Sequence, residues 1–285
     1  MKISINSNYF RARRLGQPPR SYCEAALLCK NAGFDSIDFS CSSAFCAADD
    51  WETQAKQLAE DFSKNGIVVD QTHAPFNRYA REENAIFREK LRRAFETSAI
   101  LGAKRIIVHA DEYVAPDGKY NSEDACKFAY DYFAPYVELA KKRQIGVAVE
   151  NLFEDGRCGE NRRSRCTSEV DELITIIDSF RDPAVTCCWD FGHAAVAFGD
   201  KMLEELKKIG TRLSSTHIHD NCYGNDAHLP LFFGKIDWES HIEYLRSIGY
   251  DGAFTYEFVY GCIPDALLPE YLKLAYQTAN YIINI

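Results

Sequence analysis

Eight short apolar segments, each followed by a helical pattern, recur along the 285 residues of the chain. The strands are predicted at 2–6, 35–40, 67–72, 105–108, 145–149, 184–190, 212–218 and 253–256, and the helices at 21–32, 51–65, 82–101, 122–143, 168–180, 194–209, 238–248 and 265–281. Alternating strands and helices with short, glycine-marked connections favour one parallel sheet. Eight such units in about 250 residues are typical of a (β/α)8 TIM barrel. We therefore predict an α/β fold with a single barrel domain over 1–285. An open doubly wound sheet would need a glycine fingerprint after an early strand, and the sequence has none.

Composition narrows the class of function. The net charge of −9 disfavours general binding to nucleic acid or to an anionic membrane. No apolar run reaches the length of a membrane span, and the start, Met-Lys-Ile-Ser, is too soon polar for a signal peptide. The eleven cysteines include no Cys-x-x-Cys pair, and Cys187 and Cys188 fall within a predicted buried strand. We expect reduced thiols and a cytoplasmic protein.

Polar residues gather at the carboxyl ends of the predicted strands, which is where a TIM barrel builds its active site. Of the seven histidines, only His241 lies clearly elsewhere, on a predicted helix. His217 and His219 share one strand face because side chains alternate with period two. The remaining strand-end residues are His73, His109, Glu150, Asp190, His193, Asp226, His228 and Glu257. Each has an ordinary structural explanation; Asp190, for example, could simply cap the following helix. Their common position favours a metal or catalytic site.

Five motifs carry a resemblance to a known family: Val147-Ala-Val-Glu150-Asn151, Trp189-Asp190-Phe-Gly-His193, His217-Ile-His-Asp220-Asn221, Asp226-Ala-His228-Leu-Pro and Tyr256-Glu257-Phe. The sequence resembles the xylose isomerase-like TIM-barrel superfamily, which includes sugar isomerases, ketose 3-epimerases, inosose dehydratases and endonuclease IV. The resemblance implies a metal site of Glu150, Asp190, His217 and Glu257. In the epimerases, the residues matching Glu150 and Glu257 are also the acid and base. In endonuclease IV, five further positions complete a trinuclear zinc site, here matched by His73, His109, His193, Asp226 and His228.

The residue types suit this chemistry. Carboxylates with an imidazole can bind Mn, Zn, Co or Mg. Such a metal polarises a ketose carbonyl, so that one glutamate can remove the neighbouring proton, leaving an enediolate, and the other can return it. We expect His193 to bind or polarise a substrate hydroxyl. The first hypothesis is therefore a metal-dependent sugar or sugar-phosphate isomerase/epimerase.

Two alternatives remain. A trinuclear-zinc phosphodiesterase acting on abasic DNA would use the full ligand set, although the later loops lack a basic run with aromatic residues. A barrel that binds sugar without catalysis is the third possibility, but neither acid/base glutamate is missing.

The substrate contacts are expected from His73, His109, His219, Arg11, Arg14 and Phe232. Arg11, Arg13, Arg14 and Arg20 stand near the first strand end, where they could bind a phosphate. Arg157, Arg162, Arg163 and Arg165 are mixed with acidic residues; they could also bind an anionic sugar, but the favoured interpretation is that they are solvated loop charges. Phe232 and Phe233 could form a lid, pack internally or contact a second copy. The expected partner is a small sugar or sugar phosphate, with a homo-oligomer possible.

Overall fold

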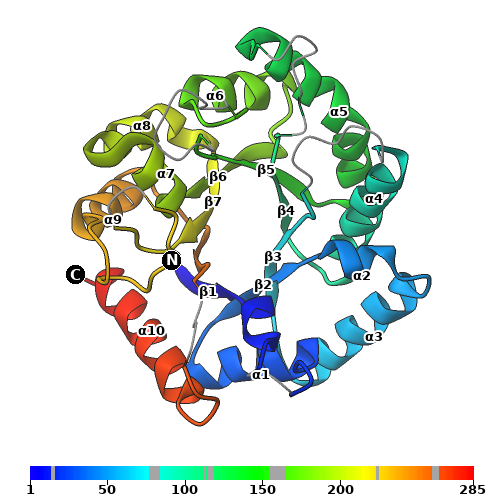
Figure 1. Cartoon of the computed structure of the whole chain (residues 1–285), viewed down its shortest axis with the longest axis vertical. Helices are drawn as coiled ribbons and strands as arrows, with labels where there is room; N and C mark the ends of the chain where they lie inside the picture. Colours follow the sequence, from blue (N-terminus) through cyan, green and yellow to red (C-terminus); the bar gives the residue numbers. More distant parts are fainter. Residues whose placement is uncertain are drawn as a thin grey trace.

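The eight strands close into one parallel barrel in the order β1 to β8, with β1 paired to β8 (Figure 1). The computed structural model describes residues 1–13, 17–76, 84–111, 113, 119–154, 165–222, 225–258 and 263–285. The strands are β1 Lys2–Asn6, β2 Ser36–Ser40, β3 Val69–His73, β4 Arg105–Val108, β5 Gly146–Glu150, β6 Val185–Asp190, β7 Leu213–Ile218 and β8 Ala253–Tyr256. The predicted barrel is confirmed, and the strand bounds differ from prediction by at most two residues.

The helices form a ring around the barrel (Figure 1). They are α1 Tyr22–Ala32, α2 Ser43–Ala47, α3 Trp51–Lys64, α4 Asn84–Ile100, α5 Ser122–Arg143, α6 Val170–Ser179, α7 Phe191–Phe198, α8 Met202–Ile209, α9 Trp238–Ser247 and α10 Leu268–Ile282, with short 3-10 turns η1 Ser7–Arg11, η2 Gly199–Lys201 and η3 Gly210–Arg212. Helix α1 begins at a capping box, in which Ser21 and Glu24 satisfy each other's backbone N–H groups. None of the described helices combines the length and apolar character needed to cross a membrane.

One helix prediction was wrong, and one short helix was not predicted. The helix expected at 194–209 starts earlier, at Phe191, and is divided into α7 and α8 by a turn at Gly199. Gly199 has a φ of +53°, a left-handed value that glycine adopts without a Cβ penalty. The short helix α2 was not anticipated. A proline inside a helix commonly kinks or breaks it, but α5 continues through Pro135 as one helix.

The strands separate an apolar outer face from a polar barrel interior. Outward side chains such as Ile3, Phe39 and Cys187 pack against the helices in the main hydrophobic core. Inside the barrel the apolar packing is small and consists of Ile107, Ala148 and Cys188. Above this layer the inward positions are polar, so the alternation of strand side chains directs the site residues to the carboxyl mouth of the barrel.

All nine cysteines in the described part of the chain are free thiols, in line with the expected reduced state.

Candidate metal centre and active site

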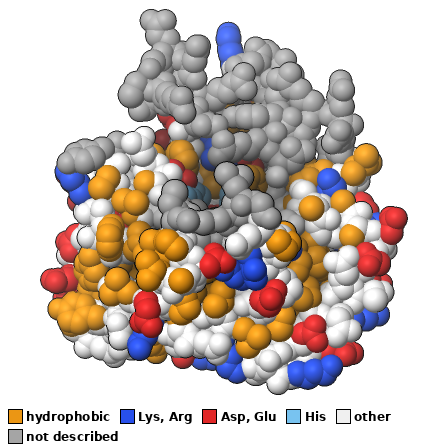
Figure 2. Space-filling model, turned by 60° about the horizontal axis from the view of Figure 1, so that its bottom comes forward, with side chains coloured by type: hydrophobic (Ala, Val, Ile, Leu, Met, Phe, Trp, Pro, Cys, Tyr) orange, Lys and Arg blue, Asp and Glu red, His pale blue; other side chains and the backbone are white. Residues whose placement is uncertain are grey.

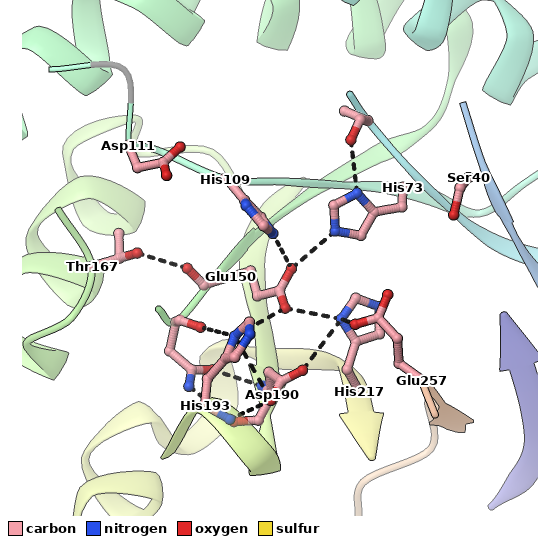
Figure 3. Close-up of polar contacts among 12 residues, drawn as sticks. Ser40, His73, His109, Asp111, Glu150, Thr167, Asp190, His193, His217 and Glu257 are labelled. Carbon is pink, nitrogen blue, oxygen red and sulfur yellow. Dashed lines mark hydrogen bonds and ion pairs between the residues drawn. The ribbon is translucent and has the colours of Figure 1, made fainter. Parts of the chain in front are cut away.

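Glu150, at the end of β5, is the centre of the site. Its Oε2 lies 3.2 Å from His73 Nε2 and 3.0 Å from His109 Nε2. Its Oε1 lies 3.0 Å from His217 Nδ1 and 3.4 Å from His193 Nδ1. Figure 3 shows these imidazoles pointing toward the one buried carboxylate, His73, His109 and His217 from the ends of β3, β4 and β7 and His193 from the first turn of α7. The barrel therefore brings together residues that are up to 144 positions apart, from His73 to His217.

Glu150, Asp190, His217 and Glu257 form a compact, fully buried group. Their ligand atoms all lie within 4.8 Å of one another. From His217 Nδ1 the distances are 3.6 Å to Glu257 Oε2 and 3.9 Å to Asp190 Oδ2. Three carboxylates held this close in a buried place repel one another unless a cation lies between them. Oxygen donors with one imidazole nitrogen suit a divalent ion, so these residues fit the metal site that the sequence predicts.

A second group of ligand-type side chains lies on the other side of Asp190: His193, His219, Asp226 and His228. Asp226 Oδ2 is 3.2 Å from His228 Nε2 and 3.7 Å from His193 Nε2. The His219 ring stacks on His228 at 3.9 Å between centroids. His219, which we expected to contact substrate, is thus a candidate ligand of this group. His73, His109 and Glu150 form a further group.

The charges of the site are set by these contacts. Burial would raise the pKa of Glu150, but His217 and His109 outweigh it and hold that pKa well below its usual range. Glu257 behaves similarly: burial opposes ionisation, and His217 still keeps its pKa below the ordinary value. Burial lowers the pKa of His109. For His73, burial is outweighed by the bond to Glu150, which raises the pKa to about 9. These contacts therefore favour the ionised form of both glutamates.

Asp190 serves two purposes at once. Its Oδ1 accepts the backbone N–H of His193 at 2.6 Å, which is the N-cap of α7. Its Oδ2 faces His219 at 3.2 Å and His217 at 3.9 Å. His219 Nε2 also lies 3.1 Å from the capping oxygen Oδ1. The capping and ligand interpretations of Asp190 are nevertheless compatible, because Oδ2 takes no part in the cap. Asn151 ties β5 to β6 by donating to the Asp190 carbonyl at 2.9 Å and accepting the Asp190 N–H at 2.7 Å.

Thr167 holds the end of β5 from outside the barrel. Its hydroxyl donates to the Glu150 carbonyl at 2.8 Å (Figure 3), and its own N–H donates to Glu172 at 3.1 Å. Its φ of +67° is unusual for a β-branched residue, and such strain persists where the surroundings impose it. Sequence reasoning missed Thr167, since nothing in its neighbourhood marks a left-handed conformation.

Asp38 and Asn6 were also missed. Asp38 Oδ2 lies 3.2 Å from His217 Nε2, and Asn6 Nδ2 donates to Glu257 Oε1 at 3.3 Å. A signal for Asp38 was present in the sequence: a carboxylate between Ile37 and Phe39, in the middle of a predicted buried strand, needs a partner.

A cavity of about 420 Å³ opens above the metal-binding groups. Its floor and walls include His73, His109, His193, Asp226, His228 and Glu257, with Tyr9, Phe76, Phe153 and Arg165 around them. Phe76 stacks on His109 with a centroid distance of 4.4 Å, and Phe153 lies 5.1 Å from His193. Histidine atoms are visible in a recess of the surface in Figure 2. The cavity is large enough for a small sugar.

Some predicted contacts lie elsewhere. The Arg11 guanidinium packs on the Tyr22 ring at 3.6 Å and donates to the Arg20 carbonyl, and Arg11 does not line the cavity. Phe232 is half exposed and lies 6.5 Å from the Tyr281 ring, also away from the cavity. A lid role for Phe232 is therefore not supported by its position. Arg14 lies outside the described residues.

Arg165 shows the opposite error. It was interpreted as a solvated loop charge, but it is only 4% exposed and lines the cavity. Its Nε and Nη2 both donate to Asp111 Oδ2, at 2.9 and 2.8 Å. Arg20 is likewise buried and pairs with Asp265 at 2.7 Å. Arg157, Arg162 and Arg163 lie outside the described residues.

The fold and the ligand groups together define a TIM barrel with candidate metal-ligand groups at its carboxyl mouth, and the comparison with known families agrees with the fold. Residues 26–277 match the family described as xylose isomerase-like TIM barrel, and the chain belongs to this family. It is 28% identical over 197 residues to the uncharacterized protein MJ1311 of Methanocaldococcus jannaschii, a match covering 67% of this chain and 64% of that protein. A match to an uncharacterized Sinorhizobium fredii protein covers 51% of the latter. The chain thus spans between half and two thirds of these two relatives.

Other relatives are named for an enzymatic activity. The chain is 21% identical over 245 residues to the L-ribulose-5-phosphate 3-epimerase UlaE of Salmonella typhi, covering 83% of this chain and 81% of the epimerase. Among solved structures it resembles L-ribulose 3-epimerase with a TM-score of 0.76, 16% identity and coverage of 99% and 94%. It also resembles the IolI protein with a bound zinc atom, with a TM-score of 0.75, 19% identity and coverage of 99% and 98%. At these identities the structural likeness shows the fold.

Proposed function

We propose that this protein is a metal-dependent sugar or sugar-phosphate isomerase/epimerase, in which Glu150 and Glu257 are the acid and base. The observation that carries the proposal is that both glutamates belong to one buried group with Asp190 and His217, and that Glu257 of this group lines a cavity large enough for a small sugar. The names of relatives support it, since UlaE and several structural neighbours are sugar 3-epimerases.

A divalent ion (Mn, Zn, Co or Mg) held by Glu150, Asp190, His217 and Glu257 would polarise the carbonyl of a bound ketose. The two glutamates approach His217 Nδ1 separately, at 3.0 Å for Glu150 and 3.6 Å for Glu257. One ionised carboxylate removes the proton beside the carbonyl, giving an enediolate, and the other returns a proton from its own side. His193 donates Nδ1–H to the Asn151 carbonyl at 2.9 Å, which leaves Nε2 facing the cavity side for a substrate hydroxyl.

Proton exchange with solvent tests this proposal. Incubation of a panel of ketoses and ketose phosphates in D2O should introduce deuterium beside the carbonyl and yield an epimer or isomer, followed by NMR. We expect Glu150→Gln and Glu257→Gln each to slow turnover by about 10²–10⁴-fold. Glu96→Gln, on α4 and paired with Arg143 outside the site, is the matched control and should be unaffected. Near-wild-type turnover in either site variant would refute the assigned roles.

A phosphodiesterase with three metal ions is the second candidate. It is favoured by a specific observation: all nine predicted ligands belong to closely spaced groups of ligand atoms. These overlapping groups are His73–His109–Glu150, His73–His217–Glu257, the central four, and His193–Asp226–His228 with His219. Against it, the net charge is −9, and acidic and basic side chains are interspersed on the face that Figure 2 shows.

Metal analysis separates the two candidates. For the isomerase/epimerase we expect one tightly held ion per chain, and His73→Ala with His109→Ala should remove only part of the activity. Three zinc ions per chain, with cleavage of abasic duplex DNA that the double variant abolishes, would establish the phosphodiesterase instead.

A further inference from the structure

The two ring nitrogens of His217 face different surroundings. Nδ1 points into the ligand group, 3.0 Å from Glu150 Oε1. Nε2 points into the barrel interior, 3.2 Å from Asp38 Oδ2 and 3.1 Å from Gln71 Nε2. His217 and Asp38 are fully buried, so water does not compete for these contacts.

These neighbours of Nε2 have opposite effects on the imidazole tautomer. A neutral imidazole carries one N–H and one lone pair, and it binds a metal through the lone pair. A carboxylate only accepts hydrogen bonds, so Asp38 favours the proton on Nε2 and the lone pair on Nδ1. The Gln71 amide nitrogen only donates, so by itself it would favour the lone pair on Nε2. Gln71 Nε2 also donates to Asp38 Oδ2 at 3.1 Å, so the carboxylate binds both groups.

Asp38 is buried in the barrel interior, away from the lining of the cavity. It is on β2, on the inward face between Ser36 and Ser40, and it is not among the residues lining the cavity. A buried carboxylate is costly unless it is bonded, and His217 and Gln71 are its side-chain partners.

We propose that Asp38 is a positioning residue, which holds His217 in the Nε2–H tautomer and so directs the Nδ1 lone pair at the metal-binding group. The inference rests on the metal site of the proposed function but on no particular sugar. Carboxylate partners of metal-ligating histidines typically contribute about 10–100-fold to metal affinity.

Zinc affinity tests the inference directly. Asp38→Asn keeps the size of the side chain but can place an N–H donor against Nε2, which favours the tautomer that cannot bind through Nδ1. In a competition titration of metal-free protein with Zn²⁺ and a chromophoric chelator, we expect binding weaker by about 10–100-fold. Asp70→Asn is the matched control: Asp70 is also a buried strand carboxylate, on β3, but it pairs with Lys104 at 2.6 Å. It should keep wild-type zinc affinity even if its melting temperature falls.

Wild-type zinc affinity in Asp38→Asn, or an equal loss in both variants, would overturn the inference. A second measurement needs no variant: NMR of the zinc-loaded wild-type protein with ¹⁵N-labelled histidine should show the His217 proton on Nε2, and a proton on Nδ1 would refute the assignment. Neither experiment contains a sugar. A protein that turns over no ketose would therefore contradict the proposed function and leave this result unchanged.

Discussion

Gly192 permits the close packing of His219 against the first turn of α7. A Cβ added at Gly192 would lie 1.8 Å from His219 Cε1 and 2.2 Å from its Nδ1. The His219 ring is fully buried, lies 3.1 Å from Asp190 Oδ1 and stacks on His228. The added methyl group would overlap the buried ring, so Gly192→Ala must displace the ring from its position against Asp190.

The size of the effect follows from opposing contributions. Alanine favours a helix over glycine by about 0.5–1 kcal/mol, which would stabilise the variant. Overpacking a buried site costs about 1–3 kcal/mol, and losing a hydrogen bond to a charged group costs about 1.5–3 kcal/mol. The unfavourable contributions exceed the gain in helix propensity, and the net destabilisation is about 2–5 kcal/mol. In domains somewhat smaller than this one, each kcal/mol of destabilisation lowers the melting temperature by about 2–4 °C, so we expect a fall of roughly 4–20 °C.

Urea denaturation and calorimetry of metal-free protein provide the measurement, and a double-mutant cycle provides the control. In a His219→Ala background the ring is gone, so Gly192→Ala should be neutral or stabilising by up to about 1 kcal/mol. The packing argument is wrong if the free energy of unfolding of Gly192→Ala is within about 0.5 kcal/mol of the wild-type value, or if the substitution lowers this free energy equally in both backgrounds.

Three further predictions concern parts of the fold around the site. Asp220 accepts the backbone N–H groups of Asn221, Phe232 and Ile236 and the Trp238 indole N–H; Asp220→Asn leaves buried donors unpaired and should cost about 2–6 kcal/mol in urea denaturation, whereas a loss below about 1 kcal/mol would contradict this. Asp111→Asn leaves the Arg165 guanidinium without its charge partner in a buried place and should cost about 3–5 kcal/mol; an unchanged urea midpoint would show that the pair contributes nothing. Burial lowers the pKa of His241, so the unfolded chain binds the proton more readily and stability is lost as pH falls through about 6.5. His241→Leu should therefore lose less stability than the wild type between pH 7 and pH 5. Equal losses in the two proteins would show that His241 does not contribute to the pH dependence of stability.

The barrel itself could be predicted because its signals are local. Strand periodicity, glycine at helix ends and the alternation of elements are all visible within a few residues, and they located all eight strands. The break at Gly199 was missed because a glycine is also tolerated inside a helix, and only the left-handed φ distinguishes the two cases.

The contacts of the loop arginines could not be predicted from local sequence patterns. Arg11 and Arg165 look alike in the sequence, each standing in a polar loop after a strand. The fold places Arg11 on the Tyr22 ring and buries Arg165 against Asp111 at the cavity wall. Charge and position along the chain carry no information about which distant side chain is the partner, so the sequence could not distinguish these two arginines.

The sequence by itself determined that this chain forms a parallel barrel with its histidines and carboxylates at one mouth, because strand alternation directs side chains to a face without reference to distant residues. Only the tertiary structure decided which of them meet: that Glu150 lies among His73, His109 and His217, that His219 joins Asp226 and His228, and that Asp38 stands behind His217. Such pairings depend on the stagger of the strands around the closed barrel and on the packing of residues far apart in the chain, which no local pattern encodes.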